Sequence, residues 1–135
     1  MINYTNNLRE HNLKATPQRL AITDILYTKG HISVEVLYEM MLKKFNSISL
    51  ATIYKNINLM IENSFIQEVK IPNAKSVYEL TKEEHSHLVC QKCNEVLDIK
   101  IDLNSIVTQT SDAYHFNIKN SNLILSGLCQ NCQQL

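Results

Sequence analysis

Apolar residues recur at helical spacing through the first half of the chain and alternate with polar residues just beyond it. After a short, weakly amphipathic segment, three stretches with the helical period each follow a residue that can cap a helix, namely Thr16, Ser33 and Ser49. They predict helices over residues 17–29, 34–45 and 50–64. Residues 65–71 and 75–80 then alternate around the turn sequence PNA, which predicts a hairpin. Helices followed by a hairpin predict a winged helix-turn-helix domain.

The predicted helix over residues 50–64 has two unlike faces. One face carries an apolar stripe made of Leu50, Ile53, Ile57, Met60 and Ile61. The other carries side chains that can hydrogen-bond to phosphates or base edges, namely Thr52, Tyr54, Lys55 and Asn58. We therefore expect this helix to contact double-stranded DNA, with Tyr54 as the first candidate for a base contact and an ordinary surface tyrosine as the alternative. Lys14 and Arg19 are candidate phosphate contacts, or else ordinary surface charges.

Beyond residue 81 the pattern changes to short apolar runs with one helix among them. HLVC and VLDIKI predict strands, Asp102 can cap a helix over residues 103–115, and LILSGLC predicts a last strand. The whole chain is therefore predicted to be α+β, with a small domain of strands and one helix after the winged helix. So short a domain buries only a small core, and it usually needs a metal, disulfides or a partner subunit.

Composition narrows the class of protein. The chain of 135 residues is 44% hydrophobic, enough for packed cores, and it contains no run of about 18 apolar residues that could span a membrane. Its start, MINYTNNLRE, lacks the basic and apolar regions of a secretory signal, so we expect a cytoplasmic protein with reduced cysteines. Residues 1–76 carry nine Lys/Arg against six Asp/Glu, and residues 77–135 carry four against seven. Such a basic half could meet phosphates, although a difference this small also arises by chance.

The four cysteines form two C-x-x-C pairs, Cys90 with Cys93 and Cys129 with Cys132. Each pair offers two thiolates at a tight turn, and two such turns complete a tetrahedral zinc site with no open position. A Zn²⁺ ion there would clip the last strand to the first and contribute to folding. Buried unligated thiols and redox pairs are the alternatives, but twin pairs in a reducing cytosol favour structural zinc.

A second set of metal-binding residue types lies around the first cysteine pair. His85 and His87 are two positions apart on a predicted strand, so their side chains point to the same side. Glu79 and Asp98 are possible oxygen ligands, and His31 lies between two predicted helices. A mixed nitrogen and oxygen set suits Fe²⁺, Mn²⁺ or Zn²⁺, and spacing alone does not choose among them. The alternative is that these are solvated surface residues.

Four segments of the chain form a recognisable set: LKATPQRLAI, ISLATIYKNI, HSHLVCQKC and a distant CQNC. In order and spacing they resemble the ferric uptake regulator family of bacterial metal-dependent repressors, and the resemblance runs nearly end to end. It implies a winged-helix DNA-binding domain over residues 1–76, a hinge over 77–82, and a dimerisation and metal-binding domain over 83–135. It also implies homodimers that bind pseudo-palindromic operators when loaded with metal.

Within that family the chain is most similar to the peroxide-sensing branch. The resemblance implies one regulatory site for Fe²⁺ or Mn²⁺ made of three histidines and two carboxylates: His31, Glu79, His85, His87 and Asp98. Asp98 matches the aspartate of the peroxide sensors, whereas Glu79 stands where that branch typically has aspartate. The resemblance points to His31 or His85 as the residue that H₂O₂ oxidises at bound Fe²⁺, with loss of repression as the result.

Three other functions compete with this hypothesis. An iron- or zinc-uptake repressor of the same family would sense metal but not peroxide, and Glu79 leaves this alternative open. A zinc enzyme could use the H-x-H pair with carboxylates, but no general base or substrate pocket can be identified, so we expect no enzymatic activity. A zinc-ribbon interaction module would leave the polar face of residues 52–58 unexplained.

Overall fold

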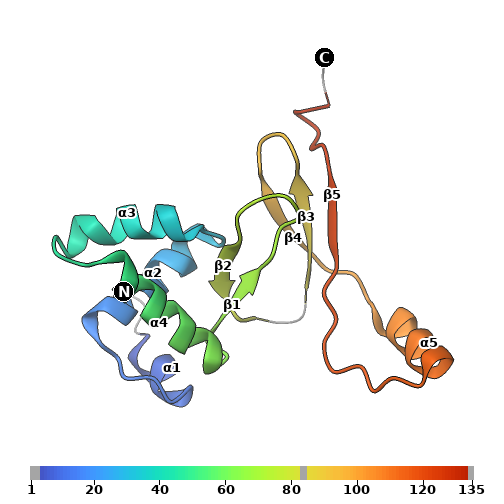
Figure 1. Ribbon diagram of the computed structural model, residues 1–135, viewed down its shortest axis with the longest axis horizontal. Helices are drawn as coiled ribbons and strands as arrows, with labels where there is room; N and C mark the ends of the chain where they lie inside the picture. The colour runs from blue at the N-terminus through green and yellow to red at the C-terminus, as the bar shows by residue number, and fades with distance from the viewer. Residues whose placement is uncertain (1–3, 83–84, 134–135) are drawn as a thin grey trace. The chain divides into compact units, whose positions relative to one another are not determined.

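The computed structural model describes residues 4 to 82 and 85 to 133 of the chain (Figure 1). The chain divides into two compact units, Met1–Lys82 and Glu83–Leu135. Glu83 and Glu84, where the sequence places the boundary between hinge and second domain, lie outside the described residues. Each unit is built around its own secondary structure, helical with a hairpin in the first and a small sheet in the second.

The first unit begins with four helices, α1 (Thr5–Glu10), α2 (Pro17–Lys29), α3 (Val34–Lys44) and α4 (Leu50–Glu62). The three predicted caps are confirmed, because the side chains of Thr16, Ser33 and Ser49 each accept a hydrogen bond from the backbone N–H three residues later. Helix α2 ends at Gly30, whose φ of 80° a residue with a side chain adopts only with strain. In the part of the chain that is described, no helix is long enough to cross a bilayer.

The predicted apolar stripes form the core of the first unit, with one error. Ile53, Ile57 and Met60 of α4 are fully buried, but Leu50 is 41% exposed. Helical side chains tilt toward the N-terminus, so a side chain in the first turn of α4 points past the end of the core. The buried stripe instead includes Asn56, a polar residue three positions after Ile53.

A hairpin completes the first unit as a winged helix. Strands β1 (Ile66–Val69) and β2 (Val77–Leu80) pair antiparallel, with Gln67 directly opposite Glu79. An isolated bridge between Ile32 and Tyr78 ties the hairpin to the loop after α2. The predicted hinge over residues 77–82 therefore includes strand β2. That this segment acts as a hinge stays a prediction.

The second unit is a three-stranded sheet with one helix. Strand β3 (Ser86–Cys90) lies between β4 (Val96–Ile99), which is antiparallel to it, and β5 (Ile124–Gly127), which is parallel to it. A parallel pair needs a long crossover, and helix α5 (Asn104–Tyr114) lies within that crossover. The prediction that Asp102 caps this helix is wrong by one position, because the N-cap is Leu103, which has no side-chain cap; Asp102 instead accepts a hydrogen bond of 2.9 Å from the backbone N–H of Asn104.

The second unit has a small core, as its length predicts. Val89 and Cys90 are its only buried apolar residues within the part of the chain that is described. Leu88, Leu97 and Leu125 face one another across the three strands, yet each remains exposed. Helix α5 stands apart from the sheet in Figure 1 and contains no buried residue. Apolar burial within one copy therefore contributes little to the stability of this unit.

Candidate metal centres and nucleic-acid interface

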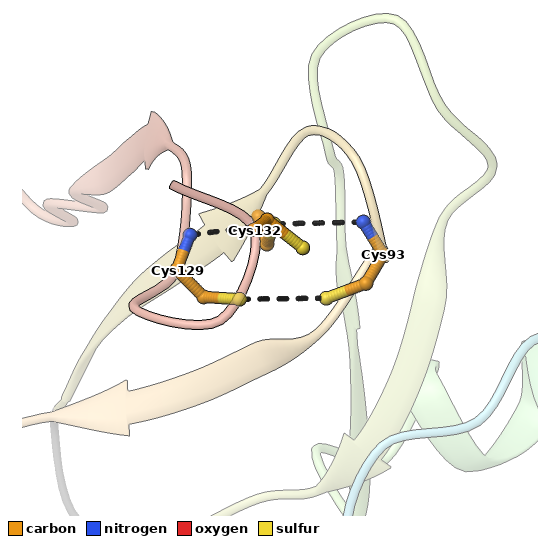
Figure 2. A group of neighbouring side chains, drawn as sticks. Cys93, Cys129 and Cys132 are labelled. Carbon is orange, nitrogen blue, oxygen red and sulfur yellow. Dashed lines mark hydrogen bonds between the residues drawn. The ribbon is translucent and has the colours of Figure 1, made fainter. Parts of the chain in front are cut away.

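The two C-x-x-C pairs meet at one end of the sheet of the second unit. Cys90 ends β3 and Cys129 follows β5, and the parallel pairing of these strands brings both turns together. The four sulfur atoms lie within 4.8 Å of one another, and those of Cys93 and Cys129 are 3.8 Å apart (Figure 2). A zinc ion bound at about 2.3 Å by four thiolates places the sulfurs of the tetrahedron about 3.8 Å from each other. The Cys93–Cys129 spacing matches a tetrahedral zinc site, and the other sulfurs are close enough to complete one.

Hydrogen bonding around the sulfurs also favours a cation. The backbone N–H groups of Cys93 and Cys129 donate to Cys90 Sγ over 3.5 and 3.4 Å, and these bonds lower the pKa of the Cys90 thiol to about 6. The pKa of Cys132 is raised to about 12, because hydrogen bonds with the sulfurs of Cys129 and Cys90 favour its protonated form. One thiolate is thus prepared at neutral pH, and a bound cation would allow the others to ionise. All four cysteines are free of disulfide bonds.

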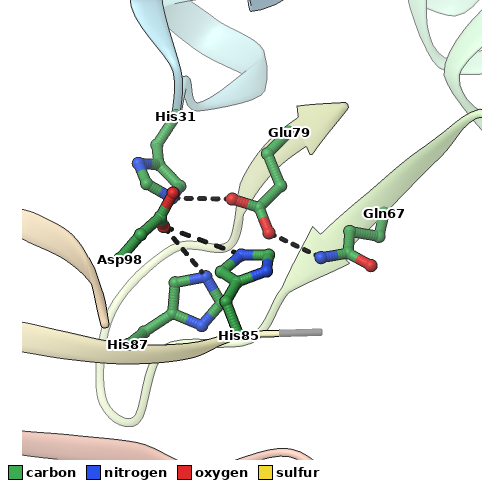
Figure 3. A network of polar contacts seen from close by, with 6 residues as sticks. All are labelled: His31, Gln67, Glu79, His85, His87 and Asp98. Carbon is green, nitrogen blue, oxygen red and sulfur yellow. Dashed lines mark hydrogen bonds and ion pairs between the residues drawn. The ribbon is translucent and has the colours of Figure 1, made fainter. Parts of the chain in front are cut away.

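Two predicted ligands, His31 and Glu79, meet in the first unit. The bridge between Ile32 and Tyr78 places the residues next to it side by side, with backbone hydrogen bonds of 3.1 and 2.8 Å. As a result, His31 Nε2 lies 2.7 Å from Glu79 Oε2, and Gln67 Nε2 donates a hydrogen bond of 2.6 Å to Glu79 Oε1 (Figure 3).

The other three predicted ligands meet in the second unit. His87 of β3 pairs in register with Asp98 of β4, and His85 comes just before β3. Asp98 Oδ1 lies 3.6 Å from His85 Nε2 and 3.5 Å from His87 Nε2, and the two imidazole centroids are 4.6 Å apart (Figure 3). The expectation that both histidines point to the same side of the strand is confirmed.

Both groups have the chemistry and dimensions of partial metal sites. Nitrogen and oxygen ligands held about 2.1 Å from one divalent ion are roughly 3.0 to 3.4 Å apart. The His31–Glu79 distance of 2.7 Å is slightly shorter than that range, and the distances of 3.6 and 3.5 Å from Asp98 to the two histidines are slightly longer. Each group contains fewer ligands than the four to six that Zn²⁺, Mn²⁺ or Fe²⁺ usually takes. Each is therefore suited to bind such an ion and incomplete by itself.

The predicted DNA-contacting face of α4 is accessible. Tyr54 is 39% exposed, Lys55 and Asn58 are exposed, and Thr52 is half-buried. The hydroxyl of Thr52 is hydrogen-bonded to the capping hydroxyl of Ser49 at 2.9 Å, so it is partly committed to the start of the helix. Tyr54, Lys55 and Asn58 thus form the more available surface.

Arg19 has structural partners that the sequence did not reveal. Its Nε donates to Asn56 Oδ1 at 3.1 Å, and its Nη1 donates to the backbone oxygen of Lys14 at 3.2 Å. Asn56 in turn donates to the backbone oxygen of Thr52. Arg19 therefore links α2, α4 and the loop that carries the exposed Lys14.

Two functional candidates were missed by reasoning from sequence, Asn56 and Gln67. A signal for Asn56 was present, because it occupies an apolar-stripe position of α4 and a buried amide needs partners. Gln67 offered no such signal. Its role depends on the register of β1 against β2, which places it opposite Glu79.

Comparison with known proteins gives a consistent result over nearly the whole chain. The profile of the Ferric uptake regulator family matches residues 10–126. The peroxide operon regulator of Bacillus subtilis is 26% identical over 129 residues, covering 94% of this chain and 89% of that protein. The ferric uptake regulation protein of Synechococcus elongatus is 31% identical over 133 residues, covering 94% and 90%. The Campylobacter jejuni peroxide stress regulator has a similar structure, with a TM-score of 0.76 at 32% identity and coverage of 97% of this chain and 100% of that chain. Peroxide and iron regulators are thus similar to this chain to comparable degrees.

Proposed function

Because this chain belongs to the ferric uptake regulator family, whose members are metal-responsive transcription repressors, we propose that it is a repressor that senses peroxide. It would bind pseudo-palindromic operators as a homodimer and lose repression when H₂O₂ oxidises a ligand histidine. The observation that carries this proposal is the histidine pair beside Asp98 on the sheet of the second unit. Imidazole ligands are the groups that such an oxidation requires.

We propose that Zn²⁺ is bound by Cys90, Cys93, Cys129 and Cys132 as a structural ion. The spacing of the sulfurs supports this assignment, as does the lowered pKa of Cys90. The regulatory ion, Fe²⁺ or Mn²⁺, would be bound by His31 and Glu79 together with His85, His87 and Asp98. Because neither group is complete alone, one ion that takes ligands from both would link the two units. An ion that favours one arrangement of the units also favours the DNA that this arrangement fits.

A second copy of the chain is the proposed partner of the second unit. The exposed stripe of Leu88, Leu97 and Leu125 and the exposed helix α5 support this, since such apolar surface is normally covered. Strand β5 is also an edge of the sheet, where another chain can pair. Sedimentation should give twice the monomer mass of 15.6 kDa, and a monomer at micromolar concentration would contradict the proposal.

Tyr54 and Lys14 should affect DNA binding in different ways. Tyr54→Ala is expected to weaken operator binding about 5- to 150-fold and to affect unrelated duplex much less, as loss of a base contact does. Lys14→Ala should weaken binding to both duplexes similarly and reduce the salt dependence by about one phosphate contact. Fluorescence anisotropy at several salt concentrations measures both effects. Tyr27→Ala, which removes an exposed tyrosine of α2, is the control and should leave binding to both duplexes unchanged. If Tyr54→Ala weakens binding to both duplexes equally, Tyr54 does not contact a base.

Oxidation would change the ligand itself. The O–O bond of H₂O₂ would break: one oxygen would be inserted into a C–H bond of the imidazole ring, giving C–OH, and the other would leave as water with the two peroxide hydrogens, so the ring loses two electrons and the peroxide gains them. Bound Fe²⁺ would supply the electron transfer that activates the peroxide next to the ligands. His31 and His85 are the proposed targets, and the altered ring would be a weaker ligand.

Protein loaded anaerobically with Fe²⁺ should gain one oxygen on the peptide that contains His31 or His85 after stoichiometric H₂O₂, and operator binding should fall in parallel. Peptide mass spectrometry and a DNA shift assay measure the two effects. His11 and His115 are internal controls that should remain unmodified, and Mn²⁺-loaded protein should remain a peroxide-insensitive repressor. Unmodified histidines with retained binding would favour the second candidate, an iron- or zinc-uptake repressor, which Glu79 supports.

A further inference from the structure

Gln67 is positioned to control the carboxylate of Glu79. The two residues are directly opposite each other in the β1–β2 hairpin, and Gln67 Nε2 donates to Glu79 Oε1 over 2.6 Å. This distance is just below the usual range of about 2.7 to 3.2 Å for N–H···O hydrogen bonds, so the amide and the carboxylate are in close contact. Glu79 is 1% exposed, so competition from water for this oxygen is small.

The two carboxylate oxygens of Glu79 have different partners. Oε1 accepts from Gln67, while Oε2 lies 2.7 Å from His31 Nε2 (Figure 3). A glutamate has one more rotatable bond than an aspartate, so more freedom must be lost when it binds an ion. A donor fixed on the neighbouring strand removes part of that freedom before the ion arrives.

We propose that Gln67 is a positioning residue for the regulatory metal, which acts by holding the Glu79 carboxylate with Oε2 directed toward His31. This inference rests on the proposed function, in which Glu79 and His31 are metal ligands. It explains how a glutamate can serve at this position. Hydrogen-bond partners of metal ligands typically change metal affinity about 10- to 100-fold when they are removed.

The test replaces Gln67 with methionine, which has a similar length and no amide donor. Isothermal titration of the zinc-containing full-length protein with Mn²⁺ should give a Kd about 10- to 100-fold higher than that of the parent protein. Gln67→Thr, which suits a strand and also lacks a reaching donor, should give the same direction of change. Asn6→Met, which replaces an amide with methionine at an exposed position of α1, is the matched control and should leave the Kd unchanged.

A double-mutant comparison separates positioning from a merely structural role. If Gln67 acts through Glu79, Gln67→Met should have no further effect on Mn²⁺ affinity in the Glu79→Ala background. If Gln67 has only a structural role, Gln67→Met should lower the melting temperature of the protein without Mn²⁺ and leave the Kd for Mn²⁺ within about twofold of the parent value. That result, or an undiminished effect in the Glu79→Ala background, would overturn the inference.

His31→Ala distinguishes this inference from the function on which it rests. If His31→Ala retains Mn²⁺ binding, the proposed regulatory site is wrong, and the inference about Gln67 is wrong with it. If His31→Ala abolishes binding and Gln67→Met leaves the Kd unchanged, only the inference about Gln67 is wrong.

Discussion

Replacing Cys90 with alanine should release the zinc ion and unfold the second unit while the first unit stays folded. Val89 and Cys90 are the buried apolar residues of the described part of that unit, so little else stabilises it. Zinc binding contributes roughly 10 to 16 kcal/mol to the folding of small zinc domains, as much as the whole stability of a typical domain. Zinc content should fall from one ion per chain to nearly none. In a thermal scan the first unit should retain its own transition, because its core is separate.

Ser126→Ala is the matched control for this experiment. Ser126 is exposed on β5 close to the second cysteine pair, and its replacement should leave zinc content and unfolding unchanged. Sedimentation of the Cys90→Ala protein should also show loss of the dimer, since the surface that would pair belongs to the second unit. Full zinc content with an unchanged transition would show that the cluster is not a structural zinc site.

Replacing His31 with alanine should abolish the effect of metal on operator binding. In the parent protein, Mn²⁺ is expected to raise operator affinity about 5- to 150-fold, the usual range of coupling between two sites. Without His31 the first unit would provide one of the proposed regulatory ligands in place of two, so the ion should have less influence on how the units are arranged. Anisotropy titrations of operator DNA with and without Mn²⁺ measure the ratio, which should fall to about one.

The His31→Ala protein should keep its zinc ion, because the four cysteines belong to the other unit. His11→Ala is the control, since His11 has a local partner, the backbone oxygen of Asn7 at 2.9 Å, and should leave the metal effect intact. A metal dependence that survives in His31→Ala would rule out an ion that links the two units.

The elements of this fold could be predicted from sequence because their signals are local. Thr16, Ser33 and Ser49 cap helices through hydrogen bonds to residues three positions away, and the alternating runs of the hairpin lie close together in the chain. The cysteine cluster was also predictable, because two C-x-x-C turns have few stable uses in a reducing environment. Leu50 was misplaced because periodicity does not reveal where a core ends.

The partners of individual side chains were decided by tertiary structure. Strand register places Gln67 against Glu79, and the bridge at Ile32 brings His31 to the same carboxylate. A hydrogen bond of 3.1 Å from Arg19 of α2 gives Asn56 of α4 its partner, so a polar residue is stable within an apolar stripe. Helix caps and the spacing of apolar residues involve residues only a few positions apart, so both can be recognised in the sequence. Hydrogen bonds between 12 and 37 positions apart exist only after the chain has folded, and they orient the side chains on which the proposed function depends.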